Sequence, residues 1–283
     1  MCDTHQHLPG SRHPHKKLPR AVSEQPIRLA IVGKGGAGKT TIAGALARTF
    51  AARGLRVLAI DADPDANLAS VLPLDGTERP KPLAQQSELL HAATSGLPQG
   101  LFLLNPDTSL LLPQGTVTWA NGQPLVALGW SKNGGEGCYC AEHALLRQLL
   151  AKASKATADI TLIDSEAGLE HLSRGTIAGI DVALVVIEPG RRSLETAAAI
   201  RQLASGLGIG QVHAVVSGCR SPQEEIQVLA WLQDWPPLAI FPYDEAVRDS
   251  DLSGEPPKLL GEFKNACETL ADSLLQLNLK AAK

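Results

Sequence analysis

The chain has 283 residues, of which 44% are hydrophobic and 19% are charged, and its formal net charge is −3 at pH 7. This length and apolar content can bury the core of one α/β domain, while the slightly acidic balance offers no electrostatic footprint for nucleic acid. Because no apolar run reaches the roughly 18–20 residues that span a bilayer, and because five cysteines suit a reducing compartment, we expect a cytoplasmic protein without stable membrane insertion.

Residues 1–26 are expected to form a disordered, histidine-rich extension. They are polar, contain four prolines and show no hydrophobic periodicity. Four of the eight histidines lie within the first fifteen residues of the chain. Imidazoles at this density can hold Ni²⁺, Zn²⁺ or Cu²⁺ loosely, and an incidental polar extension explains them equally well.

Residues 27–283 alternate short apolar strands with helices, which predicts a mostly parallel, doubly wound α/β sheet with helices on both faces. The segment 74–122 carries no clear signal. Strands are expected at 27–32, 56–60, 125–128, 160–163, 182–187, 212–216 and 238–241, and helices at 39–53, 141–153, 193–206, 223–234 and 262–277.

Between the first strand and the first helix lies a phosphate-binding loop of the pattern G-x-x-x-x-G-K-[ST]. Its glycines let backbone N–H groups surround phosphate oxygens, and the helix N-terminus adds its positive end. By this motif Lys39 reaches the β- and γ-phosphates and the Thr40 hydroxyl ligates Mg²⁺, so ATP and Mg²⁺ are the expected cofactors. The loop consists of Gly33, Lys34, Gly35, Gly36, Ala37, Gly38, Lys39, Thr40 and Thr41.

A second lysine, Lys34, follows the first glycine of this loop. The sequence K-G-G-x-G-K-[ST]-T resembles the deviant Walker A loop of the MinD, ParA and nitrogenase-iron-protein ATPases. The resemblance implies that residues 27–283 form a MinD/ParA-like P-loop ATPase domain. It also implies a homodimer that closes when both subunits hold ATP, with Lys34 acting on the partner's nucleotide as an arginine finger does.

The second predicted strand ends in the acidic segment D-A-D-P-D-A-N at 61–67. Carboxylates at the C-terminal end of a strand face the ligand crevice of an open α/β sheet. The segment resembles switch I of the same family, which implies that Asp63 orients or deprotonates the attacking water and that Asn67 senses the γ-phosphate. An acidic residue here could instead bind a ribose in a dinucleotide fold, but the G-K-[ST] ending argues against that alternative.

The strand predicted at 160–163 runs directly into Asp164. An apolar strand that ends in aspartate is typical of a Walker B motif, whose carboxylate holds Mg²⁺, usually through water. Gly168 follows and can turn its N–H toward a γ-phosphate, and the ordering of a segment by that phosphate is a known switching device.

Two later segments also follow strands. Residues 188–193, and the group Pro242, Tyr243 and Asp244, resemble segments that lie near the base and the dimer face in relatives. Ser217 stands where MinD-type relatives usually carry an asparagine whose amide reads adenine. A serine offers one hydroxyl in place of a paired donor and acceptor, and ATP remains the expected nucleotide.

The last predicted helix places several apolar residues on one face. A membrane-targeting tail is one interpretation, but basic residues are sparse, which favours a helix packed on the sheet. The residues concerned are Phe263, Cys267, Leu270, Leu274 and Leu277.

Cys138 and Cys140 lie in the glycine-rich sequence G-G-E-G-C-Y-C, just before a predicted helix. Two thiols separated by one residue can face one ion, but two ligands do not complete a site. A two-fold axis would supply a second pair, giving four sulfur ligands for tetrahedral Zn²⁺ or square-planar Ni²⁺. The nearby helix N-terminus favours the thiolate forms. Cys219 and Cys267, by contrast, are expected to be small buried hydrophobic residues.

Taken together, the loop, D-A-D-P-x-x-N, G-E-G-C-Y-C, the segment 164–176 and P-Y-D resemble the CooC-type ATPases. This family inserts nickel during maturation of carbon monoxide dehydrogenase. The resemblance implies an ATP-hydrolysing homodimeric metallochaperone whose partner is an apo-metalloenzyme such as carbon monoxide dehydrogenase. Ala141 and His143 depart from the family pattern, where proline and asparagine are expected.

Three other functions stay open at this point. A ParA/MinD-type partition ATPase would need a basic face or an amphipathic tail. A protein that holds a 4Fe–4S cluster across the dimer would suit cysteine donors, although the nitrogenase iron protein uses widely separated cysteines. A ligase of the cobyrinate-synthase group would share the loop but would not explain the C-x-C pair.

Overall fold

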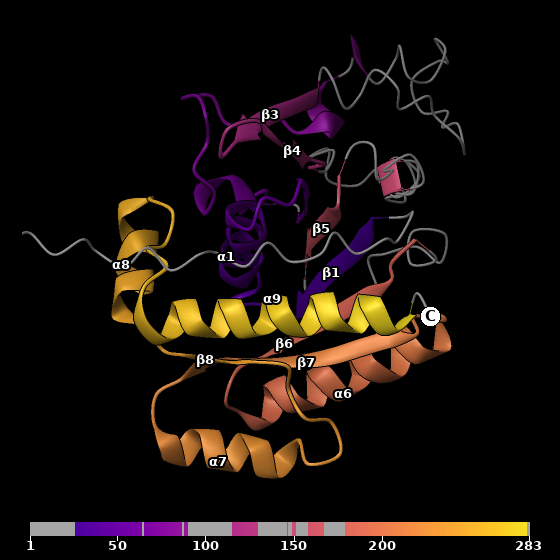
Figure 1. The fold of residues 1–283 in the computed structure, drawn as a ribbon, viewed down its shortest axis with the longest axis vertical. Helices are drawn as coiled ribbons and strands as arrows, with labels where there is room; N and C mark the ends of the chain where they lie inside the picture. The colour runs from indigo at the N-terminus through magenta and orange to yellow at the C-terminus, as the bar shows by residue number, and fades with distance from the viewer. Residues whose placement is uncertain are drawn as a thin grey trace, which may run out of the picture.

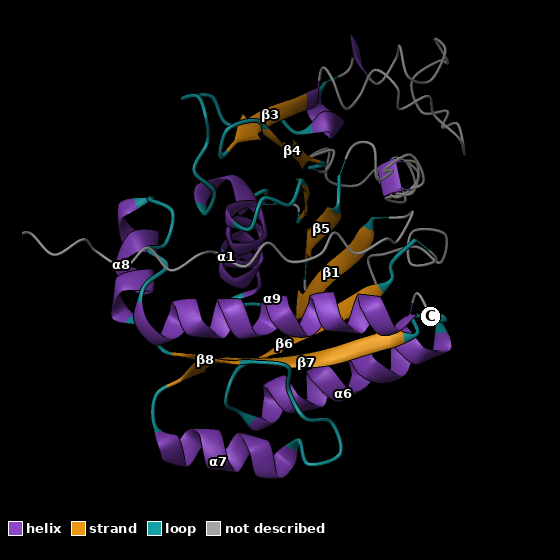
Figure 2. Ribbon diagram, viewed as in Figure 1, coloured by secondary structure: helices purple, strands orange, loops and turns teal. Residues whose placement is uncertain are grey.

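The computed structural model describes residues 26–63, 65–86, 88–89, 115–129, 146, 149–150, 158–166 and 179–281. Figures 1 and 2 show these residues as a twisted sheet with helices on both sides. The strands are β1 (Ile27–Gly33), β2 (Val57–Ala62), β3 (Thr116–Trp119), β4 (Gln123–Ala127), β5 (Ile160–Ser165), β6 (Val182–Ile187), β7 (Gln211–Cys219) and β8 (Ile240–Pro242). The α-helices are α1 (Lys39–Ala52), α6 (Arg191–Gly206), α7 (Pro222–Trp231), α8 (Glu245–Ser253) and α9 (Gly261–Ala281), and two 3₁₀ helices are η1 (Leu68–Ser70) and η2 (Leu83–Gln85).

The strands form one sheet in the order β3-β4-β2-β5-β1-β6-β7-β8. All neighbouring pairs are parallel except β3 and β4, which confirms the predicted mostly parallel, doubly wound sheet. The central strands are apolar along their length because both of their faces are covered. Strand β1 lies between β5 and β6, so the loop that follows β1 is flanked by the ends of both strands.

Two hydrophobic clusters cover the two faces of the sheet. Alternate residues of one strand point to opposite sides, so Val32 belongs to one cluster and Ile31 to the other. The first cluster packs under α6 and α7, and the second packs under α1 and α9. Figure 2 shows α6 and α9 on opposite sides of β6 and β7.

The apolar face of α9 packs on the sheet side of the molecule, as the sequence predicted. Phe263, Cys267 and Leu270 are buried, and the ring of Phe263 meets that of Phe241 edge to face at a centroid distance of 5.1 Å. Cys219 is also buried and free, so both cysteines act as small apolar residues. None of the helices among the described residues is long and apolar enough to cross a bilayer.

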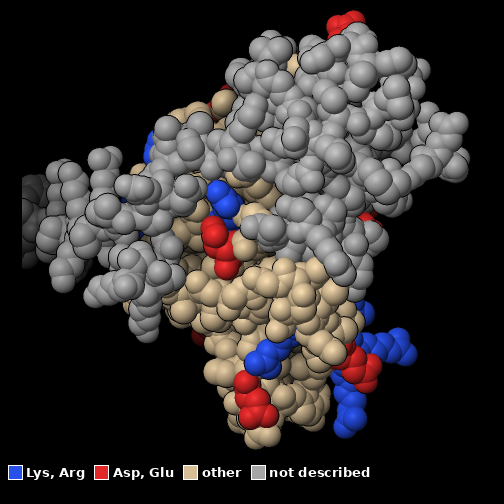
Figure 3. All heavy atoms as spheres, turned by 90° about the vertical axis from the view of Figure 1, so that its right-hand side faces the viewer, with Lys and Arg blue, Asp and Glu red and all other residues tan. Residues whose placement is uncertain are grey.

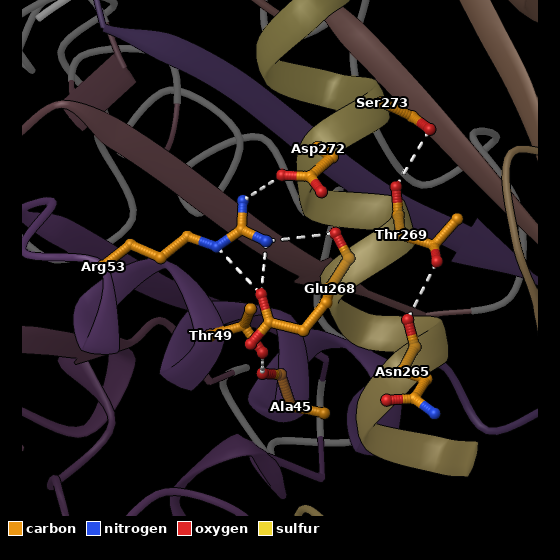
Figure 4. A network of polar contacts seen from close by, with 8 residues as sticks. All are labelled: Ala45, Thr49, Arg53, Asn265, Glu268, Thr269, Asp272 and Ser273. Atoms are coloured by element: carbon orange, nitrogen blue, oxygen red, sulfur yellow. Dashed lines mark hydrogen bonds and ion pairs between the residues drawn. The ribbon is translucent and has the colours of Figure 1, made fainter. Parts of the chain in front are cut away.

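An ionic network ties α9 to the end of α1 (Figure 4). The guanidinium of Arg53 donates to the Glu268 carboxylate, to the Glu268 carbonyl at 3.1 Å and to the Asp272 carboxylate at 2.7 Å. The Arg53 side chain is largely buried beneath these partners. Because α1 starts at the phosphate-binding loop, this network stabilises the helix on which the loop depends. On the face shown in Figure 3, several of the described Lys and Arg side chains lie next to Asp or Glu.

One strand and one α-helix had no counterpart in the predicted set. Strand β3 lies inside the segment without a clear signal and pairs antiparallel with β4 through a turn at 120–122, where all three residues have positive φ. Helix α8 exposes most of its residues and contains few apolar ones. The helix predicted at 141–153 falls outside the described residues except at 146, 149 and 150.

Candidate functional site

The loop between β1 and α1 has the backbone geometry of an anion site. Gly36 and Gly38 adopt left-handed φ values of 81° and 85°. Gly38 is the N-cap of α1, yet no side chain of the described residues caps the helix, and its first turn holds no acidic residue. Among these residues nothing occupies the first backbone N–H groups of α1, which can therefore bind phosphate oxygens that the helix dipole also attracts. Thr40 and Thr41 follow in the first turn.

Gly33 fits between two strands only because it lacks a side chain. Its φ is 148°, and a Cβ atom would lie 2.4 Å from the carbonyl oxygen of Val186 on β6. We expect Gly33→Ala to destabilise the fold by about 2–4 kcal/mol, since backbone strain and a backbone clash add. Chemical denaturation measures this. The matched control is Gly35→Ala, where a Cβ would meet nothing within 4 Å; equal stability of the two variants would contradict the prediction.

Lys39 lies buried beneath the loop, with 7% of its surface exposed. Its ammonium donates to the carbonyl of Lys34 at 3.4 Å. A buried ammonium that contacts one carbonyl keeps donors free for a second partner, and the uncapped end of α1 lies beside it. Lys39 and the free N–H groups together form a positively charged cradle.

Asp164 lies at the end of β5, level with Ile31 of β1, and only 1% of its surface is exposed. Burial raises its pKa to about 7, against the opposing influence of the Thr40 hydroxyl and the Lys39 ammonium. Neither carboxylate oxygen has a partner of normal hydrogen-bond geometry among the described residues. A buried, unpartnered carboxylate next to a hydroxyl is a hard oxygen donor set, so Asp164 and Thr40 fit Mg²⁺.

Asp61 is a further buried carboxylate that the sequence analysis did not single out. It ends β2 level with Asp164 and is 1% exposed. It accepts the Leu68 N–H at 2.7 Å and the Asp63 N–H at 3.2 Å. Burial, together with the nearby Asp164 charge, raises the pKa of Asp61 to about 8. The sequence signal that could have identified Asp61 is its position as the first aspartate of D-x-D, near the end of an apolar strand.

Asp63 and Asn67 lie in the segment 63–68, whose first and last backbone N–H groups donate to the Asp61 carboxylate. The Asp63 carboxylate accepts the Asp65 N–H at 2.9 Å, and its charge helps to raise the pKa of Asp164. Asp63 therefore lies near the buried carboxylates, at the same end of the sheet as the loop. Asn67 is exposed and begins η1.

Lys34 makes an ion pair within its own chain. Its ammonium lies 2.7 Å from the Glu188 carboxylate, which follows β6 on the other side of β1. The two side chains are 37% and 39% exposed. The sequence analysis identified the residue but not this partner, because the two positions meet only through the strand order.

The segment after β8 makes contacts of its own. The Asp244 carboxylate caps α8 by accepting the Ala246 N–H at 2.8 Å. The ring of Tyr243 lies under the guanidinium of Arg220, 4.3 Å from its centroid. Pro242 ends β8. Ser217 lies against the loop, since its hydroxyl oxygen is 3.0 Å from where a Cβ of Gly38 would be.

Cys138, Cys140 and Gly168 lie outside the described residues. Within the part of the chain that the structure describes, His, Cys, Asp and Glu side chains form no group of three or more suited to a metal ion.

A parallel sheet, a glycine loop leading into an uncapped helix, a buried lysine and an aspartate on the adjacent strand define a P-loop ATPase. The chain belongs to the CobQ/CobB/MinD/ParA family of nucleotide-binding domains, whose model matches residues 29–257.

One relative and two solved structures illustrate the similarity of this chain to proteins of the family. The chain is 40% identical to the carbon monoxide dehydrogenase accessory protein CooC of Rhodospirillum rubrum, over 81% of this chain and 88% of that protein. The fold is similar to that of a ParA family ATPase from Chlorobium tepidum, with a TM-score of 0.66 and 19% identity over 90% of this chain and all of that one. MinD from Pyrococcus horikoshii, solved with Mg-ADP, gives a TM-score of 0.63 at 21% identity, covering 89% and 97% of the two chains.

Proposed function

We propose that this protein is an ATP-hydrolysing, nucleotide-dependent homodimeric metallochaperone. It binds Ni²⁺ through Cys138 and Cys140 and helps to insert the ion into a metalloenzyme such as carbon monoxide dehydrogenase. The observation that carries the proposal is the 40% identity to CooC over most of the chain, in a sequence that also has the C-x-C pair. Residues 27–283 are the ATPase domain in this proposal, and residues 1–26 are an extension outside it.

The charged and polar groups of the site have separate roles in ATP hydrolysis in this proposal. Lys39 and the free N–H groups of α1 neutralise the β- and γ-phosphates, while Asp63 holds the attacking water. Thr40 and Asp164 would hold Mg²⁺, which neutralises phosphate charge when bound. The support is geometric: the Asp164 oxygens are buried without hydrogen-bond partners of normal geometry among the described residues.

Other residues report the state of the nucleotide. In this proposal Asn67 and Gly168 contact the γ-phosphate, and Lys34 reaches the nucleotide of the second subunit. Pro242, Tyr243 and Asp244 lie beside the base. Release of the γ-phosphate removes these contacts and loosens the dimer.

The ion is the cargo of the reaction. Each subunit supplies two thiolates, so a dimer supplies four ligands around one two-fold axis, and neither subunit holds the ion alone. Dimerisation by ATP then tightens metal binding, and linkage requires the metal to tighten ATP binding by the same factor, typically about 5–150-fold.

Metal titration of untagged protein tests this proposal. We expect one Ni²⁺ per two chains, bound at least about fivefold more tightly with a non-hydrolysable ATP analogue than without it. Cys138→Ser and Cys140→Ser should each abolish this site, while the control Cys219→Ser, at a buried free cysteine, should not.

Two results would contradict the proposal. Equal Ni²⁺ affinity with and without the analogue would show that nucleotide binding and metal binding are not coupled. Protein that is brown after anaerobic purification, with iron and sulfide bound at the same cysteines, would replace nickel delivery by an iron–sulfur function.

A further inference from the structure

The ion pair between Lys34 and Glu188 joins two segments that are 154 residues apart in the chain. Glu188 belongs to a well-anchored turn, because its N–H donates to the hydroxyl of Ser193, a residue that is 2% exposed at the start of α6. On the other side, Lys34 precedes Gly35 and Gly36, whose surroundings are open. An anchored carboxylate therefore holds a lysine that is followed by a loop with open surroundings.

Lys34 is held at its backbone as well as at its side chain. Its carbonyl accepts the Lys39 ammonium at 3.4 Å and the Ala37 N–H at 3.2 Å, while its own ammonium contacts Glu188 at 2.7 Å. Phosphates that bind Lys39 would draw its ammonium away from the Lys34 carbonyl, a contact that is already long at 3.4 Å. A bound triphosphate would therefore weaken one of the contacts that hold Lys34.

We propose that Glu188 is a latch that retains Lys34 in its own subunit until two nucleotide-bound subunits meet. This inference rests on the proposed ATP-dependent homodimer. The contact at 2.7 Å fixes the Lys34 ammonium beside Glu188 of its own chain, and the side chain must leave that position to reach a phosphate across an interface. Closing the dimer therefore exchanges one contact for the other in each subunit. A triphosphate, which carries more negative charge than a diphosphate, displaces the carboxylate more readily.

The expected effect is modest because both side chains are about 40% exposed. A pair of this kind is worth about a factor of two in an equilibrium constant. Since a dimer opens two such pairs, the two factors of about two multiply, and Glu188→Gln should lower the dimer dissociation constant by about fourfold. Raising the salt concentration should shrink the difference, because a half-exposed pair is screened.

Sedimentation equilibrium with Mg²⁺ and a non-hydrolysable ATP analogue measures this constant. The control Glu195→Gln removes the same charge from an exposed position on α6 and should leave the constant unchanged. The change should also vanish when Lys34 is absent, so Lys34→Ala and the double variant Lys34→Ala/Glu188→Gln should dimerise equally weakly. Circular dichroism confirms that each variant is folded.

Three outcomes would overturn the latch, and they are distinguishable. If the wild-type protein and Glu188→Gln have the same dimer dissociation constant, Glu188 is not a latch, and the proposed function is unaffected. A weaker Glu188→Gln dimer shows that Glu188 supports the interface instead. A wild-type protein that stays monomeric with the analogue overturns the proposed homodimer and the latch with it.

Discussion

Replacing Lys39 by methionine is expected to lower kcat for ATP hydrolysis by about 10³-fold. The ammonium is buried, and its charge partly offsets the rise that burial causes in the pKa of Asp164. Methionine keeps the length and apolar stem of the side chain but removes the charge that would meet the β- and γ-phosphates. Because the loop backbone is unchanged, the N–H groups of α1 stay available and some nucleotide binding is retained.

Steady-state phosphate release and equilibrium binding of a fluorescent ATP analogue together measure the two effects. The matched control is Lys264→Met, which removes the same charge from an exposed position on α9 and should leave kcat unchanged. A Lys39→Met variant that keeps more than about a tenth of the wild-type kcat would show that Lys39 does not stabilise the transition state.

The nucleotide-free protein is expected to lose stability as the pH rises from about 4 to about 8. Burial is the main reason that the pKa of Asp61 rises to about 8 and that of Asp164 to about 7, from an ordinary value of 3.8. Over this range the folded state holds more protons than the unfolded state, so raising the pH favours unfolding. Each carboxyl group therefore destabilises the folded state when it is charged and does so much less when it is protonated.

Asp164→Asn should remove one of these costs. We expect it to raise the unfolding free energy of the nucleotide-free protein by about 2–4 kcal/mol at pH 8, and by little near pH 4. Mg²⁺ and ATP should stabilise this variant less than they stabilise the wild-type protein, since an amide is a poorer Mg²⁺ ligand than a carboxylate.

Urea denaturation in the presence of EDTA, at pH values between about 4 and 8, measures the first effect. Asp234→Asn is the control, because it makes the same chemical change at an exposed position after α7 and should not show the stability gain expected of Asp164→Asn. A wild-type protein that becomes more stable over this range, or an Asp164→Asn variant that is less stable than wild type at pH 8, would contradict the prediction.

The parts of the fold that were predicted correctly share a physical basis. Strands β1, β2, β5, β6 and β7 are buried on both faces, so each appears as an apolar run that local composition reveals. Helix α8 was missed because it is polar and begins at an aspartate cap, a signal that is weak without an apolar face behind it. Strand β3 was missed because it is only four residues long and gains its order from pairing with β4.

Residue spacing along the chain was enough to define the phosphate-binding loop, the acidic strand ends and the family, because each depends on neighbours within a few positions. The apposition of Asp61 with Asp164, and of Lys34 with Glu188, depends instead on the order of strands in the sheet. Strand β5 enters between β1 and β2, and β6 lies on the other side of β1. Burial and electrostatic coupling follow from that arrangement, so they arise only once distant segments have packed together.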